Sequence, residues 1–319
     1  MYDCSMEKLV WKKFILGTDN LDYILEKEVG GVIFFTKDIL SKRQFKNLIK
    51  DIKSKSKVPL FLSIDQEGGR VERTENISPR RLSAQHAYKK GGVFLKKQSD
   101  EISKELADYG INLNFAPCVD VNTNKNNPII GERAFSDSPE DVIKGMNIFI
   151  ESSKKYGIIS CIKHFPGHGN ADQDSHITLP QIDLTLDEME KTHIKPFKFA
   201  VENNIDMVMV AHLHCKCFDN EIIPTSLSKN AINYLRKTLN YNGIVISDDM
   251  VMQGLQNFGE LEALIMAINA GVDMFIYRNS DNKVLRLIDR LCKIVENNEE
   301  LKVKIMESNA RIQSLKNKL

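Results

Sequence analysis

The chain has no long uninterrupted hydrophobic run, which excludes the most common type of membrane-spanning segment. A membrane-spanning helix needs roughly 20 consecutive, mostly apolar residues, and no window of this sequence approaches that length. The N-terminal residues MYDCSMEKLVWKKF also lack the apolar core of a secretory signal peptide. We therefore expect a cytoplasmic protein with no membrane partner.

The sequence also lacks an excess of charge of either sign. It has 44 basic and 43 acidic residues, so no large basic field is available to attract nucleic acid. The sequence has six cysteines, and a disulfide framework is not expected for a chain of this size in the cytoplasm. Cys118 and Cys161 lie in apolar runs, where a reduced cysteine behaves as a small hydrophobic residue.

What the sequence does contain is an alternation of short apolar runs with amphipathic stretches. The runs are nearly continuous in apolar residues, as expected of parallel strands that are buried on both faces. The clearest runs are 29–35, 58–65, 111–121, 158–165, 206–212, 243–249 and 272–277. A weaker run at 10–17 is a candidate for an eighth strand.

Some helices between these runs have recognisable ends. Pro139 suits the first position of a helix, and Gly157 suits its end. Thr185 and Glu188 form a capping box ahead of a helix predicted over 189–201.

Repeated strand–helix units without a low-complexity linker predict one α/β domain spanning residues 1–319. Helices from about residue 281 should pack on its outside. Both a doubly wound sheet and a (β/α)8 TIM-type barrel fit this pattern. Polar residues end five of the runs: Asp65, Asp120, His164, His212 and Asp248. The barrel is favoured because it brings the C-terminal ends of all strands together at one face.

The densest group of polar residues is KHFPGHGNADQDSH, at 163–176. Asp174 and His176 stand two residues apart, so they point the same way in an extended loop. A carboxylate beside an imidazole can orient it and raise its basicity, as a general acid/base requires. Two alternatives are a purely structural loop and a metal site. The metal site is the weaker, because the loop lacks a helical H-x-x-x-H pair and is rich in Gly and Pro.

Asp248, in the sequence SDD at the end of a buried run, is a candidate nucleophile. A carboxylate suits attack on an anomeric carbon, because that transition state is positively charged. The alternative is that Asp248 or Asp249 caps the next helix. The strings DQEGGRVER and GERAF supply paired acidic and basic side chains that can bind sugar hydroxyl groups.

The string HLHCKC, beginning at His212, has the appearance of metal-ligand spacing. A second Cys or His pair at the distance typical of structural zinc is missing, so a metal is not favoured here. His212 is instead expected to form part of the active-site wall.

Taken in order, IDQEGGRVER, NFAPCVDVN, NNPIIGERAF, KHFPGHGNADQDSHITLP, MVMVAH and ISDDM resemble glycoside hydrolase family 3. The resemblance is to its bacterial β-N-acetylglucosaminidase branch, and it covers roughly residues 30–277. It implies that Asp248 is the nucleophile of a retaining mechanism, with His176 as acid/base and Asp174 as its partner. The residues that it implies for N-acetylglucosamine binding are Asp65, Arg73, Arg133, Lys163 and His164. It implies no metal or organic cofactor.

The expected function is removal of terminal β-linked N-acetylglucosamine from peptidoglycan fragments by a monomer. One alternative is a sugar-binding or sensor barrel without activity, which the presence of Asp248, Asp174 and His176 disfavours. Another is a metal-dependent hydrolase that uses His164, His168 and His176. Phosphorolysis of the same bond and β-glucosidase activity also remain open.

Overall fold

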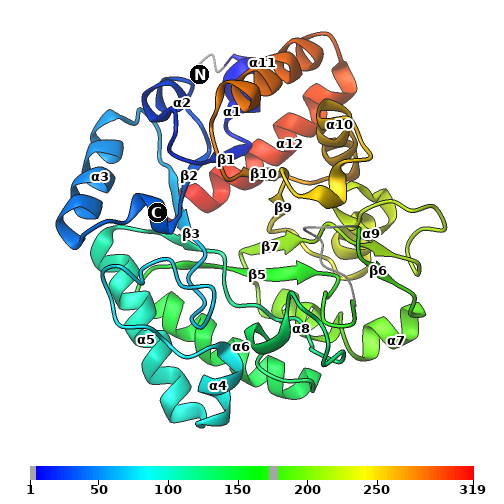
Figure 1. Ribbon diagram of the computed structural model, residues 1–319. Helices are drawn as coiled ribbons and strands as arrows, with labels where there is room; N and C mark the ends of the chain where they lie inside the picture. Colours follow the sequence, from blue (N-terminus) through cyan, green and yellow to red (C-terminus); the bar gives the residue numbers. More distant parts are fainter. Residues whose placement is uncertain (1–4, 172–178) are drawn as a thin grey trace.

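The computed structural model of the protein describes residues 5–171 and 179–319. Eight parallel strands close into a barrel in the order β1-β10-β9-β7-β5-β4-β3-β2, and helices surround it (Figure 1). The strands are β1 Phe14–Leu16, β2 Gly31–Phe34, β3 Phe61–Ile64, β4 Leu113–Asn114, β5 Ile159–Phe165, β7 Met207–Val210, β9 Ile244–Asp249 and β10 Met274–Tyr277. The predicted (β/α)8 barrel is confirmed.

The weak run at 10–17 does provide the eighth strand, β1. It pairs with β10 through Phe14 and Phe275, and with β2 through Ile15 and Gly31. On its other side Gly31 pairs with Phe61 of β3, and a Cβ atom there would lie 2.5 Å from the carbonyl oxygen of Phe61. The absence of a side chain at Gly31 therefore allows β2 and β3 to pair closely.

Two apolar layers hold the barrel together. Side chains from alternate strand positions fill its interior, and those pointing outward pack against the helices. The interior layer consists of Ile15, Ile33, Phe61, Leu113, Phe115, Ile159, Cys161, Met207, Met209, Ile244, Ile246, Met274 and Ile276, joined by Ile312 and Leu315. The barrel is therefore a packed core, and only its ends are open to ligands.

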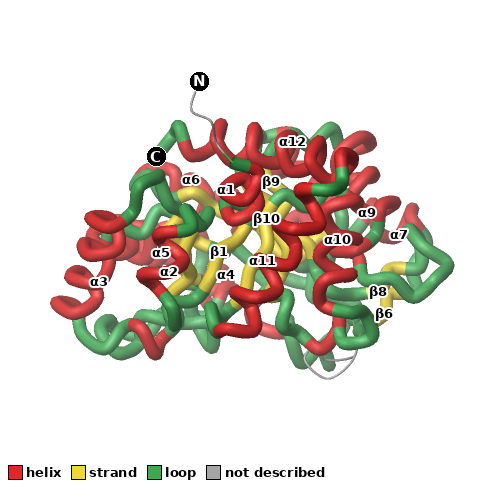
Figure 2. Tube along the Cα trace, turned by 90° about the horizontal axis from the view of Figure 1, so that it is seen from above, coloured by secondary structure: helices red, strands yellow, loops and turns green. Residues whose placement is uncertain are grey.

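The α-helices are α1 Met6–Trp11, α2 Leu21–Glu26, α3 Lys42–Lys55, α4 Ala84–Lys89, α5 Gly92–Tyr109, α6 Pro139–Lys155, α7 Leu186–Lys191, α8 Lys195–Glu202, α9 Lys229–Asn233, α10 Glu260–Ala270, α11 Asn282–Glu296 and α12 Glu299–Lys316. Figure 2 shows α12 at one end of the barrel and the short strands β6 (Gln181–Ile182) and β8 (His214–Cys215) toward the other. The last turn of α12 places Ile312 and Leu315 against the interior side chains. It thereby covers the end of the barrel opposite the site described below.

One predicted helix is wrong in extent. The Thr185–Glu188 capping box is present, but the stretch predicted as one helix over 189–201 forms two, α7 and α8. Pro196 lies in the first turn of α8, where the missing N–H costs nothing, whereas inside a continuous helix it would remove a hydrogen bond. The chain therefore ends one helix at Lys191 and starts another at Lys195.

Candidate active site

A cavity of about 370 Å³ opens at the C-terminal end of the strands. Six of the eight residues predicted from the sequence line it: Asp65, Arg73, Arg133, Lys163, His164 and Asp248. They come from four strands or the segments just after them, and the barrel brings them together because all its strands are parallel. The two other predicted residues, Asp174 and His176, lie outside the described residues.

Glu67 is the centre of a buried charge network in the cavity wall. Arg133 donates two hydrogen bonds to its carboxylate, at 2.9 and 2.8 Å. The ammonium of Lys163 lies 2.6 Å from Glu67 and 2.6 Å from Asp65. Burial alone would raise the pKa of Glu67, but the charges of Arg133 and Lys163 outweigh it and hold this pKa far below its usual value. The network keeps both cations charged and fixed in position.

His164 is held between an acidic and a basic partner. Its Nδ1 lies 2.7 Å from Oδ2 of Asp120, and its Nε2 lies 3.4 Å from Nη2 of Arg133. Because an arginine can only donate, this pattern assigns the proton to Nδ1 and leaves Nε2 as an acceptor. Asp120 also accepts the backbone N–H of His168 at 2.6 Å. The ring of His164 is thus oriented by contacts on both of its nitrogens.

Asp248 lies near the end of β9 and lines the cavity. Its Oδ1 accepts the backbone N–H of Asp249 at 2.7 Å. Burial opposes ionisation of Asp248. The imidazoles of His164 and His212 favour ionisation, as do the backbone N–H of Asp249 and the charge of Lys163. The balance leaves the pKa of Asp248 below its ordinary value. The carboxylate is therefore ionised at neutral pH, as a nucleophile requires.

Asp249 has a different role from its neighbour. It forms an ion pair with Arg278 and accepts the backbone N–H of Val251 at 3.1 Å. Burial raises its pKa despite the charge of Arg278. Asp249 is already held by these two partners, which leaves Asp248 as the carboxylate available for chemistry.

Of two further histidines singled out in the sequence, His168 lines the cavity and His212, which was expected in its wall, does not. His212 is buried, and its Nδ1 lies 2.7 Å from the hydroxyl of Ser226, so it supports the wall from behind rather than lining the cavity. His168 does line the cavity, and neither of its ring nitrogens has a hydrogen-bond partner among the described residues.

A possible metal-ligand group among the described residues combines Cys118, Asp120 and His164. The thiol of Cys118 donates to Asp120 at 3.2 Å, and His164 is bound to the same carboxylate oxygen. These groups therefore satisfy one another by hydrogen bonding. The set differs from the predicted alternative of His164, His168 and His176, of which His176 is not described.

Comparison with known proteins agrees with this arrangement. Residues 6–315 match the model of the Glycosyl hydrolase family 3 N terminal domain. The chain belongs to glycosyl hydrolase family 3. The resemblance stated from the sequence motifs is thereby confirmed at the level of the family.

Individual relatives of this family 3 chain carry similar names. It is 32% identical to "Beta-hexosaminidase A" of Pseudoalteromonas piscicida, over 93% of this chain and 55% of that protein. It is also 32% identical to "Beta-hexosaminidase" of Haemophilus influenzae, over 94% of this chain and 85% of that protein. The chain thus spans about half of the first relative and most of the second.

The barrel fold of this chain also resembles that of a solved structure. The family 3 β-N-acetylglucosaminidase from Paenibacillus sp. str. FPU-7 superimposes with a TM-score of 0.92 at 29% identity. The superposition covers 98% of this chain and 62% of that one.

Several residues in or behind the lining of the family 3 cavity were not assigned from the sequence. Glu67 was noted only as part of a charged string, although it joins the lining residues Arg133 and Lys163. Phe35 and Arg278 line the cavity themselves, and Phe35 lies under the guanidinium of Arg73 at 5.6 Å. Both stand at or just beyond the ends of predicted strands, and this position was the one available signal for them.

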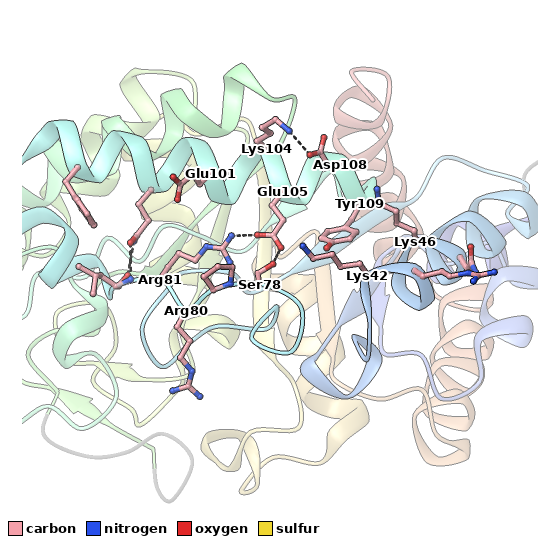
Figure 3. Close-up of a pocket in the computed structure, with 16 residues that line it drawn as sticks. Lys42, Lys46, Ser78, Arg80, Arg81, Glu101, Lys104, Glu105, Asp108 and Tyr109 are labelled. Atoms are coloured by element: carbon pink, nitrogen blue, oxygen red, sulfur yellow. Dashed lines mark hydrogen bonds and ion pairs between the residues drawn. The ribbon is translucent and has the colours of Figure 1, made fainter.

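A second, larger hollow of about 880 Å³ lies on the outside of the barrel, between α3 and α5. Figure 3 shows that many of its charged side chains face one another: Arg81 pairs with Glu105, and Lys104 with Asp108. None of the predicted site residues lines it. It is therefore a groove between surface helices rather than a catalytic centre.

Burial of histidines predicts how stability depends on pH. Burial lowers the pKa of both His168 and His193 to about 4. In the unfolded chain each of these histidines binds a proton near pH 6.5, whereas in the folded chain it does so only near pH 4. The free energy of unfolding should therefore fall as pH is lowered from 6.5 to 4, by up to about 3 kcal/mol for each histidine.

Urea unfolding at several pH values measures this effect. His193 lies between α7 and α8, outside the cavity, so His193→Gln is the suitable variant. Its stability should vary less with pH over this interval than that of the natural chain. The same pH slope in both proteins would contradict the assignment.

Proposed function

We propose that this family 3 barrel is a retaining exo-β-N-acetylglucosaminidase, which removes a terminal β-linked N-acetylglucosamine. The observation that carries the proposal is the ionised Asp248 in the same small cavity as Asp65, Arg73, Arg133, Lys163 and His164. One wall holds fixed charged groups that suit sugar hydroxyls, and the nucleophile comes from another strand. The names of the relatives support the same activity.

The proposed roles follow from the groups present. The carboxylate of Asp65 can accept hydrogen bonds from sugar hydroxyls, and Arg133 and Lys163 can donate them. The long 3.4 Å contact between Nε2 of His164 and Arg133 can give way to a hydroxyl or an amide N–H of the sugar, which Nε2 then accepts. Because their partners already hold these side chains, little conformational entropy is lost when the sugar binds.

In the proposed mechanism, Asp248 attacks the anomeric carbon and forms a covalent glycosyl-aspartate. His176, oriented by Asp174, protonates the departing oxygen. It then removes a proton from water, which attacks the same carbon and releases the sugar with retained configuration. The cationic character of the transition state is stabilised by the carboxylate of Asp248.

We further propose that the natural substrates are peptidoglycan fragments and that the enzyme acts as a monomer in the cytoplasm. Among the described residues, no helix has the length and apolar character needed to cross a membrane. Five cysteines, 118, 161, 215, 217 and 292, are free thiols, in keeping with a reducing compartment.

Release of p-nitrophenol tests the activity. The β-N-acetylglucosaminide should be cleaved much faster than the matching β-glucoside, and EDTA should leave the rate unchanged because no metal takes part. A rate that depends on added phosphate, with a sugar phosphate as product, would indicate phosphorolysis instead. Inhibition by EDTA would favour the metal-dependent alternative.

Failure to cleave either substrate would favour the sugar-binding alternative. Binding of N-acetylglucosamine, followed as a rise in melting temperature, then distinguishes a sugar-binding barrel from a protein that does not recognise this sugar. Comparable cleavage of both substrates would make the enzyme a broader β-glycosidase.

A further inference from the structure

The thiol groups of Cys215 and Cys217 lie side by side, outside the active-site cavity. Their sulfur atoms are 3.2 Å apart. Cys215 ends strand β8 and is 2% exposed, whereas Cys217 is partly exposed at the surface. A disulfide has a sulfur–sulfur distance of about 2.05 Å, so bond formation needs an approach of only about 1 Å.

The two thiols differ in reactivity. The hydrogen bond between them lowers the pKa of Cys217 and raises that of Cys215, which burial raises further. Asp219 and Glu190 are the nearby acidic groups, and they oppose ionisation of Cys217. The more exposed thiol is thus the better nucleophile, and the buried one is placed to react second.

The backbone between the cysteines is tied to another strand. Cys215 pairs with Ile182 in the two-stranded sheet formed by β6 and β8. The N–H of Lys216, the residue between the two cysteines, donates to the carbonyl oxygen of Ile182 at 3.1 Å. A bond between the sulfurs on either side of Lys216 closes a small ring that contains this amide, and ring closure constrains the backbone dihedral angles that its hydrogen bond to Ile182 also depends on.

We propose that Cys215 and Cys217 form a redox modification site that reacts with small-molecule disulfides and, when oxidised, releases the Lys216 amide from β6. The thiolate of Cys217 attacks one sulfur of the small disulfide, forms a mixed disulfide and expels one thiolate. That thiolate takes the proton of Cys215, whose sulfur then attacks Sγ of Cys217 and expels the second thiolate. The second thiolate takes up from water the proton that Cys217 released when it ionised. Two protein thiols are oxidised to one disulfide, and one small disulfide is reduced to two thiols.

This proposal is independent of the glycosidase activity. Oxidised glutathione is a suitable probe: the reduced full-length protein is incubated with it, and free thiols are then alkylated in denaturant for peptide mass analysis. The peptide containing both cysteines should lose about 2 Da and resist alkylation, as intramolecular disulfide formation requires. Alkylation of both residues in the treated protein would overturn the proposal.

Variants separate the two steps. Cys215→Ser should stop at a mixed disulfide between Cys217 and glutathione, because the second thiol is missing. Cys217→Ser should leave Cys215 reduced, because it is buried. Cys292→Ser, at a buried cysteine of α11, is the control and should oxidise like the natural chain. A persistent mixed disulfide in the natural chain would show that Cys215 does not react, and would also overturn the proposal.

The coupling to β6 has its own measurement. Hydrogen exchange of the Lys216 amide should become faster in the oxidised protein, because its bond to Ile182 is lost. The exchange rate should return when a dithiol reductant restores the thiols. Unchanged exchange in the fully oxidised protein would contradict the coupling.

Discussion

Asp248→Asn is expected to lower the turnover of N-acetylglucosaminides by at least roughly 10³-fold, since an amide cannot form the glycosyl-enzyme. The substitution keeps the shape of the side chain, and the asparagine Oδ1 can still accept the Asp249 N–H. The charged wall formed by Glu67, Arg133 and Lys163 remains in place. Initial rates with the p-nitrophenyl substrate measure the loss.

Binding and stability distinguish a chemical defect from a folding defect. Asp248→Asn should still show a rise in melting temperature with N-acetylglucosamine and should unfold near the urea concentration of the natural chain. Asp249→Asn, the same change at the next residue, should retain measurable turnover, because Asp249 is engaged with Arg278. Normal turnover in Asp248→Asn would remove Asp248 as the nucleophile.

Glu67→Gln should damage both stability and catalysis, although Glu67 was not among the residues predicted to bind substrate. Its carboxylate is buried between Arg133 and Lys163. Removing one partner of a buried ion pair costs about 3–5 kcal/mol, because the remaining charges lose their compensation. We expect a loss of this order in the free energy of unfolding, measured with urea.

The catalytic effect of Glu67→Gln should appear mainly as a weaker affinity for the sugar, because Arg133 and Lys163 lose their common anchor. A rise in KM of roughly tenfold or more corresponds to losing one good charged hydrogen bond. Glu132→Gln is the matched control: Glu132 is partly exposed, and its carboxylate lies 3.3 Å from Nδ1 of His86. Equal behaviour of the two variants would show that the buried network has no special role.

Part of the fold could be predicted because burial on both faces leaves a direct signature in the sequence. Seven apolar runs marked seven strands of the barrel, and the weak eighth run at 10–17 was also a strand. Strand length was less predictable. The run at 111–121 contains only the two-residue strand β4, and at its end the side chain of Asn114 bonds to the backbone N–H and C=O of Gln66, at 2.9 Å each.

The break between helices α7 and α8 could not be predicted from the local sequence pattern either. Residues 189–201 carry a helical pattern of apolar positions, and the pattern does not show that the chain changes direction at Thr192. Ile194 and Met189 pack in a small apolar cluster with Leu213 and Cys215, away from the main core. The direction of the second helix therefore depends on contacts with residues that are distant in sequence.

By itself, the sequence determined the class of fold, the family and which polar residues stand at strand ends. These are local properties, because apolar runs, caps and motifs can be read within a few residues. Only the tertiary structure decided which charges pair. Glu67 and Lys163 are 96 positions apart in the chain, and Asp120 and His164 are 44 apart, yet each pair is in contact. Such pairings arise when strands close into a barrel, because closure sets the distances between side chains and removes the water that would otherwise screen their charges.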